Sequence, residues 1–104
     1  MEDSVYVVSL SYKVDLSEVD NYIEEHVAFL EKYYEKGNFM ASGRKVPRTG
    51  GVILAQAESK ESLMTILQED PFFKADIANY EIIEFAPTKV AQGFESLKPE
   101  SVTP

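Results

Sequence analysis

The sequence contains no cysteine, which excludes disulfides, zinc–thiolate sites, iron–sulfur clusters and thiol nucleophiles together. This absence also fits a reducing compartment. Basic residues are scarce as well, because ten Lys and Arg stand against eighteen Asp and Glu and leave a net charge of −8. A protein of this sign repels the phosphates of nucleic acids, so we expect no nucleic-acid partner.

Long apolar runs are also absent. None approaches the roughly 18 residues that cross a membrane, and the acidic start MEDS lacks the basic segment of a signal peptide. We therefore expect a cytoplasmic protein with no membrane partner.

The sequence offers few ligands for a metal or a cofactor. Transition-metal sites combine several His, Cys or carboxylate ligands, and this chain has one histidine. It has neither an EF-hand loop nor a recognisable acidic cluster. The phosphate-binding patterns G-x-x-x-x-G-K-[ST] and G-x-G-x-x-G are missing too. We expect neither a metal nor a cofactor.

The 104 residues, 44% of them hydrophobic, suit a single domain with its own core. We expect this domain over residues 1–90 and a polar tail over residues 91–104. Only Phe94 and Leu97 are large apolar residues in that tail. The tail is either a solvated end or a short arm that docks these two side chains on a partner subunit.

The segment Leu16–Gly37 carries the longest periodic pattern of the chain. Apolar side chains recur there at helical spacing, whereas most charged side chains fall outside the stripe, which consists of Val19, Tyr22, Ile23, His26, Phe29, Leu30 and Tyr33. Ser17 followed by Asp20 is a start signal, and Gly37 is a stop signal. The pattern predicts one helix with the histidine on its apolar face.

Four segments rich in β-branched and aromatic residues predict strands: Ser4–Lys13, Asn38–Val46, Gly51–Glu58 and Asn79–Pro87. The turn cluster at residues 47–51 joins the middle two in a hairpin.

A second helix is predicted between the last two strands. Ser59 is its N-cap, and Asp70-Pro71 ends it, because a residue before proline avoids the helical region. Phe72 and Phe73 then form a short, packed turn. The order β-α-β-β-α-β predicts an α+β fold of the ferredoxin-like, split βαβ type, in which a four-stranded antiparallel sheet carries both helices on one face.

Apolar residues occupy both faces of the predicted strands, although two helices cover only one face. In the first strand, for example, Tyr6 and Val8 alternate with Val5 and Val7. The second face needs a cover, and a second copy of the chain is the simplest one. We therefore expect a homodimer that packs sheet on sheet, or a higher oligomer built from it.

His26 is the first candidate for chemistry, because histidine exchanges protons near neutral pH. In the expected fold the two helices run antiparallel, so Asp70 approaches the inward-facing histidine. A carboxylate on one ring nitrogen would fix the tautomer and leave the other nitrogen to take a substrate proton. The alternatives are a structural histidine, and an aspartate that only forms the turn before Pro71.

Ser42, Gly43 and Arg48 are candidate substrate-binding residues. Gly43 would mark a strand bulge or let a ligand approach the backbone, and the Ser42 hydroxyl could then donate or accept a hydrogen bond. Ser42 lacks the G-x-S-x-G context of an activated nucleophile. Arg48 lies in a turn where its cation suits a carboxylate-bearing ligand. A plain hairpin with a solvated arginine is the alternative.

The segments EEHVAFLEKYYEKGNFMASG, PRTGGVILA, EDPFF and YEIIEFAPTKV together resemble the YCII-related domain family. These small proteins are related to muconolactone isomerase and to the dimeric α/β-barrel superfamily. The resemblance covers about residues 4 to 90. It implies a ferredoxin-like dimer with a pocket lined by the helix histidine and the aspartate of the Asp-Pro-Phe turn, which are His26 and Asp70 here.

Most members of the family lack an assigned activity, and a few are dehydrochlorinase-like or act on other ring compounds, using a His-Asp pair without a cofactor. This chain departs from the family in two places. Many members have a basic residue before the histidine, where Glu24 and Glu25 stand here. Many have a proline after Ser-Gly, where Arg44 stands here. Arg48 or Arg44 is therefore the expected substitute for an anion contact.

The leading hypothesis is a cofactor-independent lyase or isomerase for a small molecule. In it, His26 is the general acid/base, Asp70 orients His26, and the substrate pocket is shaped by Ser42, Gly43 and Arg48. The competing hypothesis is a non-catalytic dimer that holds a metabolite in the same pocket. A third possibility is a structural dimer in which the histidine is fully buried between main-chain carbonyls.

Overall fold

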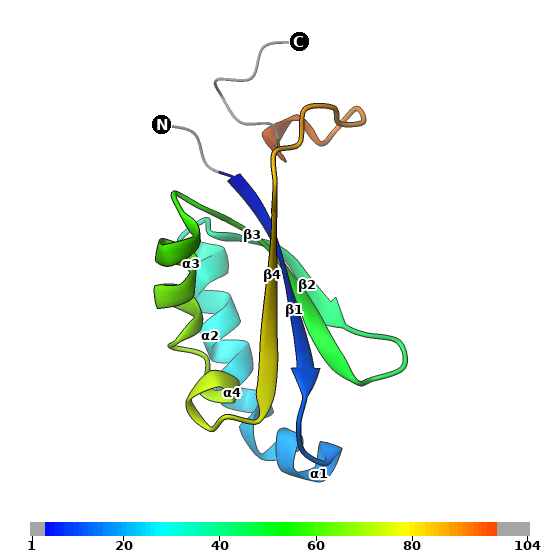
Figure 1. Cartoon of the computed structure of the whole chain (residues 1–104), viewed down its shortest axis with the longest axis vertical. Helices are drawn as coiled ribbons and strands as arrows, with labels where there is room; N and C mark the ends of the chain where they lie inside the picture. Colours follow the sequence, from blue (N-terminus) through cyan, green and yellow to red (C-terminus); the bar gives the residue numbers. More distant parts are fainter. Residues whose placement is uncertain (1–3, 98–104) are drawn as a thin grey trace.

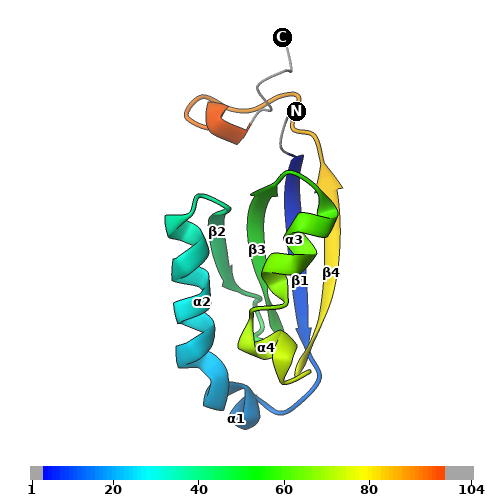
Figure 2. The same ribbon diagram turned by 90° about the vertical axis from the view of Figure 1, so that its left-hand side faces the viewer.

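Four antiparallel strands form one sheet, and helices cover one of its faces (Figures 1 and 2). The structure is a computed structural model in which residues 4–97 are described. The strands lie in the spatial order β2-β3-β1-β4, where the bounds are β1 Ser4–Tyr12, β2 Phe39–Arg44, β3 Gly50–Ala57 and β4 Ala78–Phe85. This architecture confirms the predicted ferredoxin-like α+β fold.

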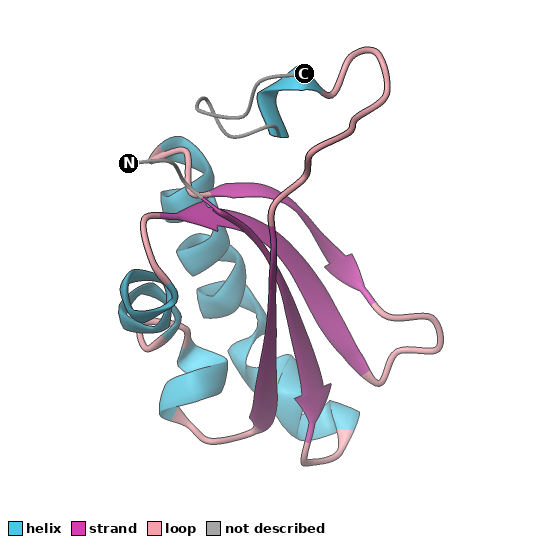
Figure 3. Cartoon of the chain, turned by 45° about the horizontal axis from the view of Figure 1, so that its top comes forward, coloured by secondary structure: helices cyan, strands magenta, loops and turns pink. Residues whose placement is uncertain are grey.

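The core lies between the sheet and the helices (Figure 3). Alternate residues of the central strand β1 point into it, and the register places Val8 between Ile53 of β3 and Ile82 of β4. Buried side chains from every layer complete it, among them Tyr6, Leu10, Val19, Phe29, Tyr33, Phe39, Leu63, Leu67, Phe72 and Ile77. The alternation read from the sequence separates the two faces of β1, and the structure places Tyr6, Val8 and Leu10 on the inward one.

The prediction of one uninterrupted helix from Leu16 is wrong. The segment forms a short helix α1 (Leu16–Val19), a 3-10 turn η1 (Asp20–Tyr22) and the long helix α2 (Ile23–Glu35). The N-cap position belongs to Asp15, so Ser17 lies inside α1 and is not the start signal. Aspartate and asparagine compete with helical backbone bonds, and they occupy the interruption as Asp20-Asn21.

The end of α2 follows the sequence signal. Gly37 has φ of +88°, a conformation that glycine adopts without strain, and the amide of Asn38 donates to the Tyr33 carbonyl at 3.0 Å. The chain then turns directly into β2. Because α2 and β2 are joined this tightly, the histidine-bearing helix lies beside the edge strand of the sheet (Figure 2).

The second helical region comprises α3 (Lys60–Leu67) and the short helix α4 (Pro71–Lys74). Ser59 caps α3 as predicted, accepting a hydrogen bond from the Ser62 amide at 3.0 Å. The expected packed turn after Asp70 is α4, with Pro71 in its first turn, where the missing amide hydrogen costs no bond. Phe72 is buried, so this turn contributes to the core.

The hairpin β2–β3 carries an irregularity, but not at the glycine. The register shift lies between Phe39 and Ala41, and Gly43 pairs regularly with Val52. A Cβ added to Gly43 would meet nothing within 4 Å. Gly43 is thus not at the bulge of this hairpin. The space that a side chain at this position would occupy is open.

The sheet face opposite the helices keeps apolar side chains in solvent. Val7 lies between Leu54 and Ile83 in the register, and all three point to this face. Ile83 is 52% exposed and Phe85 is 41% exposed. We call the surface formed by Val7, Val52, Leu54, Ile83 and Phe85 the open sheet face.

Beyond β4 the chain leaves the end of the sheet and forms a last 3-10 turn, Glu95–Leu97 (Figure 1). Phe94 is 57% exposed, and the Gln56 side chain donates to the Ser96 carbonyl at 3.4 Å. The division of the chain at residue 90 stays a prediction, and residues 98–104 of the predicted tail lie outside the described residues. Across residues 4–97, no helix has the length and apolarity to cross a membrane.

The contact between Gly50 and β1 gives a stability prediction. A Cβ at Gly50 would lie 1.8 Å from the Leu10 carbonyl oxygen, and a backbone atom cannot move aside as a side chain would. We expect Gly50→Ala to lower the free energy of unfolding by about 1–3 kcal/mol, measured by urea denaturation. Gly43→Ala is the matched control and should leave the midpoint unchanged or raise it. Equal stability of the two variants would contradict this contact.

Candidate functional site

A cavity of about 250 Å³ opens between α2 and the β2 edge of the sheet. Helix α2, the hairpin β2–β3, β1 and α4 all contribute to its wall, which is lined by Leu10, Tyr12, Ile23, His26, Leu30, Ser42, Gly43, Arg44, Arg48, Gly51, Val52, Ile53 and Phe72. Four of the five residues singled out in the sequence line the cavity. The fifth, Asp70, is fully buried behind the histidine.

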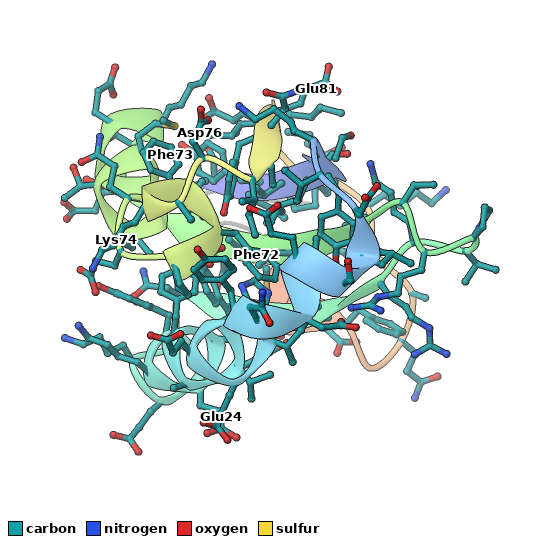
Figure 4. The ribbon with its side chains drawn as sticks, turned by 90° about the horizontal axis from the view of Figure 1, so that it is seen from below. Glu24, Phe72, Phe73, Lys74, Asp76 and Glu81 are labelled. Atoms are coloured by element: carbon teal, nitrogen blue, oxygen red, sulfur yellow. The ribbon has the colours of Figure 1, made fainter. Side chains whose placement is uncertain are left out.

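His26 lies on the inward face of α2, where the apolar stripe predicts it. Its side chain is 14% exposed, and Nδ1 lies 2.8 Å from Oδ1 of Asp70. The imidazole stacks on the ring of Phe72 with centroids 4.0 Å apart and planes 5° from parallel. Figure 4 shows the molecule from below, with Phe72 of α4 labelled near the centre of the view. One hydrogen bond and one stacked ring therefore hold the imidazole.

Asp70 is the N-cap of α4 and has no solvent exposure. Its Oδ1 accepts the Phe72 amide at 3.0 Å as well as His26, and its Oδ2 accepts the Tyr80 hydroxyl at 2.6 Å. Asp70 forms the turn, and the same carboxylate contacts the histidine.

Tyr80 is the residue that the sequence analysis missed. It is opposite Leu10 in the register and projects toward the core from β4. Burial, and after it the neighbouring Asp70 carboxylate, raise the pKa of Tyr80 above its ordinary value, so the hydroxyl stays a donor at neutral pH. The alternation of β4 groups Tyr80 with Ile82 on one side of the strand, but it does not show that this side meets Asp70.

The contacts of His26 decide which chemistry the ring can perform. An ionised Asp70 only accepts hydrogen bonds, so Nδ1 of the neutral ring carries the proton and Nε2 has a free lone pair. No group among the described residues hydrogen-bonds Nε2. The ring can accept a proton at Nε2 while Asp70 stabilises the resulting cation through Nδ1.

Ser42 and Gly43 form the edge-strand wall of the cavity. The Ser42 hydroxyl lies 2.6 Å from the Tyr34 hydroxyl of α2, so one of the two donates to the other. Gly43 leaves its part of the wall free of a side chain. Within the described structure, neither residue contacts a side chain that could act as a general base. Their positions in the wall suit a role in shaping the binding site of a ligand.

The cavity also has two arginines, which differ in their contacts. Arg48 forms an ion pair with Asp20, with the two atoms 2.7 Å apart, and this carboxylate raises the pKa of the guanidinium. Arg44 forms no ion pair with any described carboxylate. Within residues 4–97 no group of three or more potential metal-ligating side chains gathers, so we assign no residue to a metal.

Comparisons with known proteins identify a family and a similar fold. The family model described as the YCII-related domain matches residues 5–86. Among solved structures, the chain is similar to the 5-chloro-2-hydroxyhydroquinone dehydrochlorinase of Burkholderia phenoliruptrix AC1100 in complex with 2,5-dihydroxybenzoquinone, with a TM-score of 0.65 and 20% identity. The alignment covers 78% of this chain and 92% of the other. A search of curated proteins finds no match.

The contact between His26 and Asp70 predicts one tautomer of the neutral ring. We expect ¹H–¹⁵N spectra of the single histidine to show the proton on Nδ1. Asp70→Ala should abolish this preference, and it should lower the free energy of unfolding by about 1–3 kcal/mol because buried donors lose their acceptor.

Glu69→Gln is the matched control for the tautomer, since Glu69 is the adjacent acid but contacts Lys32 and Tyr33 instead. It should leave the histidine spectrum unchanged. A wild-type ring protonated on Nε2 alone would contradict the assigned contact.

Proposed function

Because the chain belongs to the YCII-related domain family, we propose that it is a cofactor-independent enzyme of the lyase or isomerase type that acts on a small ring compound. The observation that carries the proposal is the contact between His26 and a fully buried carboxylate at the wall of a cavity. A histidine held in this way is an effective general acid/base.

In the proposed reaction His26 transfers the proton and Asp70 orients the ring. Nε2 takes a proton from the substrate, and the cation that forms is stabilised through Nδ1 by the carboxylate. In a lyase the leaving group then departs with its bonding electron pair, as chloride does in an elimination of HCl. In an isomerase the imidazolium returns the proton to another atom of the substrate.

The size and lining of the cavity support a single-ring substrate. An apolar cavity of about 150 Å³ is enough for benzene, and this one is about 250 Å³ with Leu10, Leu30 and Ile53 in its wall. The structurally similar dehydrochlorinase acts on a chlorinated, hydroxylated ring. We propose substrates of the same chemical class for this chain, bound between His26 and the wall formed by Ser42, Gly43 and Arg48.

A purely structural histidine fits these contacts less well. The third possibility raised from the sequence requires a fully buried ring with both nitrogens on main-chain carbonyls. Here the partner of Nδ1 is a side-chain carboxylate, and the ring faces a cavity. A non-catalytic binding protein would have the same pocket, so turnover is the measurement that separates it from an enzyme.

We expect the chain to eliminate HCl from 5-chloro-2-hydroxyhydroquinone, or to convert a related hydroxylated ring found in a thermal-shift screen, without an added cofactor. His26→Ala should reduce kcat/KM by about 10²–10⁴-fold, the usual contribution of a positioned general acid/base. Chloride release and product analysis measure the reaction.

Val27→Ala is the matched control, because Val27 is the next residue of α2 but is 42% exposed and does not line the cavity. It should retain the wild-type rate. Unchanged turnover in a folded His26→Ala variant would refute the assigned role. A wild-type protein that binds such rings and transforms none would be a binding protein instead of an enzyme.

We further propose that the working form is a homodimer joined through the open sheet face, as in a dimeric α/β barrel. Val52, Ile83 and Phe85 are 37%, 52% and 41% exposed and lie on the same face of the sheet. An apolar surface of this kind is typical of an interface. A second copy of the chain offers the matching surface by twofold symmetry.

Light scattering on micromolar protein should give twice the chain mass of 11.7 kDa. Ile83→Asp should shift the mass toward the monomer, because it places a charge in the proposed interface. Val46→Asp is the matched control, since Val46 is 91% exposed in the hairpin loop and lies off this face. A monomeric wild type would rule out the dimer.

A further inference from the structure

The charge of the cavity differs from that of the protein as a whole. The chain has a net charge of −8. Yet the residues lining the cavity include Arg44 and Arg48 and no carboxylate. Asp70, the acid nearest the histidine, is fully buried behind the ring and uses both oxygens for internal hydrogen bonds. The cavity is thus a locally basic hollow in an acidic protein.

The two arginines are not equivalent. The charge of Arg48 is largely balanced by Asp20 of η1, and this ion pair joins the hairpin loop to the start of α2. Arg44 lies at the end of β2, is exposed, and has no carboxylate partner among residues 4–97. No group among the described residues pairs with the Arg44 guanidinium, so its donors are open to a ligand.

We infer that the ligand of this cavity is a single-ring anion, such as a carboxylate, phenolate or enolate, and that Arg44 binds its negative group. This inference rests on the proposed function only in using the same cavity. The apolar wall covers the ring, and the guanidinium donates charge-assisted hydrogen bonds to the anionic oxygen. Arg48 is a positioning residue that ties the loop to Asp20.

The surroundings of Arg44 favour selectivity for anions over neutral rings. An anionic ring bound in the cavity would lie near the Arg44 guanidinium of its wall, and opposite charges attract. The net negative charge of the protein repels anions, so binding depends on the local charge of Arg44. A neutral ring would gain only the apolar contacts, which both kinds of ligand share.

Calorimetric titration with two probes tests the inference. The first is 2,5-dihydroxybenzoquinone, whose hydroxyls are acidic enough to ionise at neutral pH, and the second is hydroquinone, a neutral ring of similar size. We expect the wild type to prefer the anionic probe. Arg44→Gln should weaken the binding of that probe roughly tenfold, which corresponds to the loss of one charge-assisted hydrogen bond. The same substitution should change the affinity for hydroquinone little.

Lys45→Gln is the matched control, because Lys45 is the adjacent cation but contacts Ser11 and does not line the cavity. Lys45→Gln should leave both affinities unchanged. Arg48→Gln should lower the affinity for the anionic probe less than Arg44→Gln does. A wild type that binds neither probe, or binds them equally, would overturn the inference. Unchanged affinity in Arg44→Gln, or a larger loss in Arg48→Gln, would do the same.

The titration and the turnover assay test the anion site and the proposed enzymatic function separately. Anion binding that depends on Arg44, together with no turnover of any bound ring, would reject the enzyme and retain the anion site. Turnover that depends on His26 but is insensitive to Arg44→Gln would retain the enzyme and reject the anion site.

Discussion

One buried carboxylate organises the candidate site. Asp70 accepts hydrogen bonds from the backbone of α4, from the imidazole on α2 and from the tyrosine on β4. A buried charge is costly unless it is fully hydrogen-bonded, and here three donors satisfy it. Because these donors come from different elements, the carboxylate fixes the helices and the last strand relative to one another, and it orients the histidine by the same contacts.

The Asp-Pro-Phe sequence explains how so short a segment performs several tasks. Asp70 supplies the N-cap, Pro71 begins the turn, and Phe72 places its ring against the imidazole. Each role is also a structural one, since caps, helix starts and packed aromatic rings stabilise any fold. Stability and the candidate chemistry thus depend on the same atoms, and a substitution at Asp70 affects both.

Much of this arrangement was predictable from the sequence. The apolar stripe of α2 puts His26 on the inner face, and antiparallel helices in this fold bring Asp70 to it. The contact of Tyr80 was not predicted because it depends on strand register, which pairs β4 with β1 and is set by the whole sheet. The interruption at Asp20 was missed because the apolar spacing continues through it, so periodicity alone gives no signal there.

The interruption has a consequence for the charge of the cavity. An uninterrupted helix would present Asp20 at a different angle, whereas the 3-10 turn holds its carboxylate against Arg48. Arg48, one of the two arginines that line the cavity, is therefore already paired with a carboxylate. Arg44, on the edge strand, keeps no such partner among the described residues. Among the described residues, Arg44 is thus the arginine of the cavity that has no carboxylate partner, and under our proposal its charge would distinguish ligands by their sign as well as by their shape.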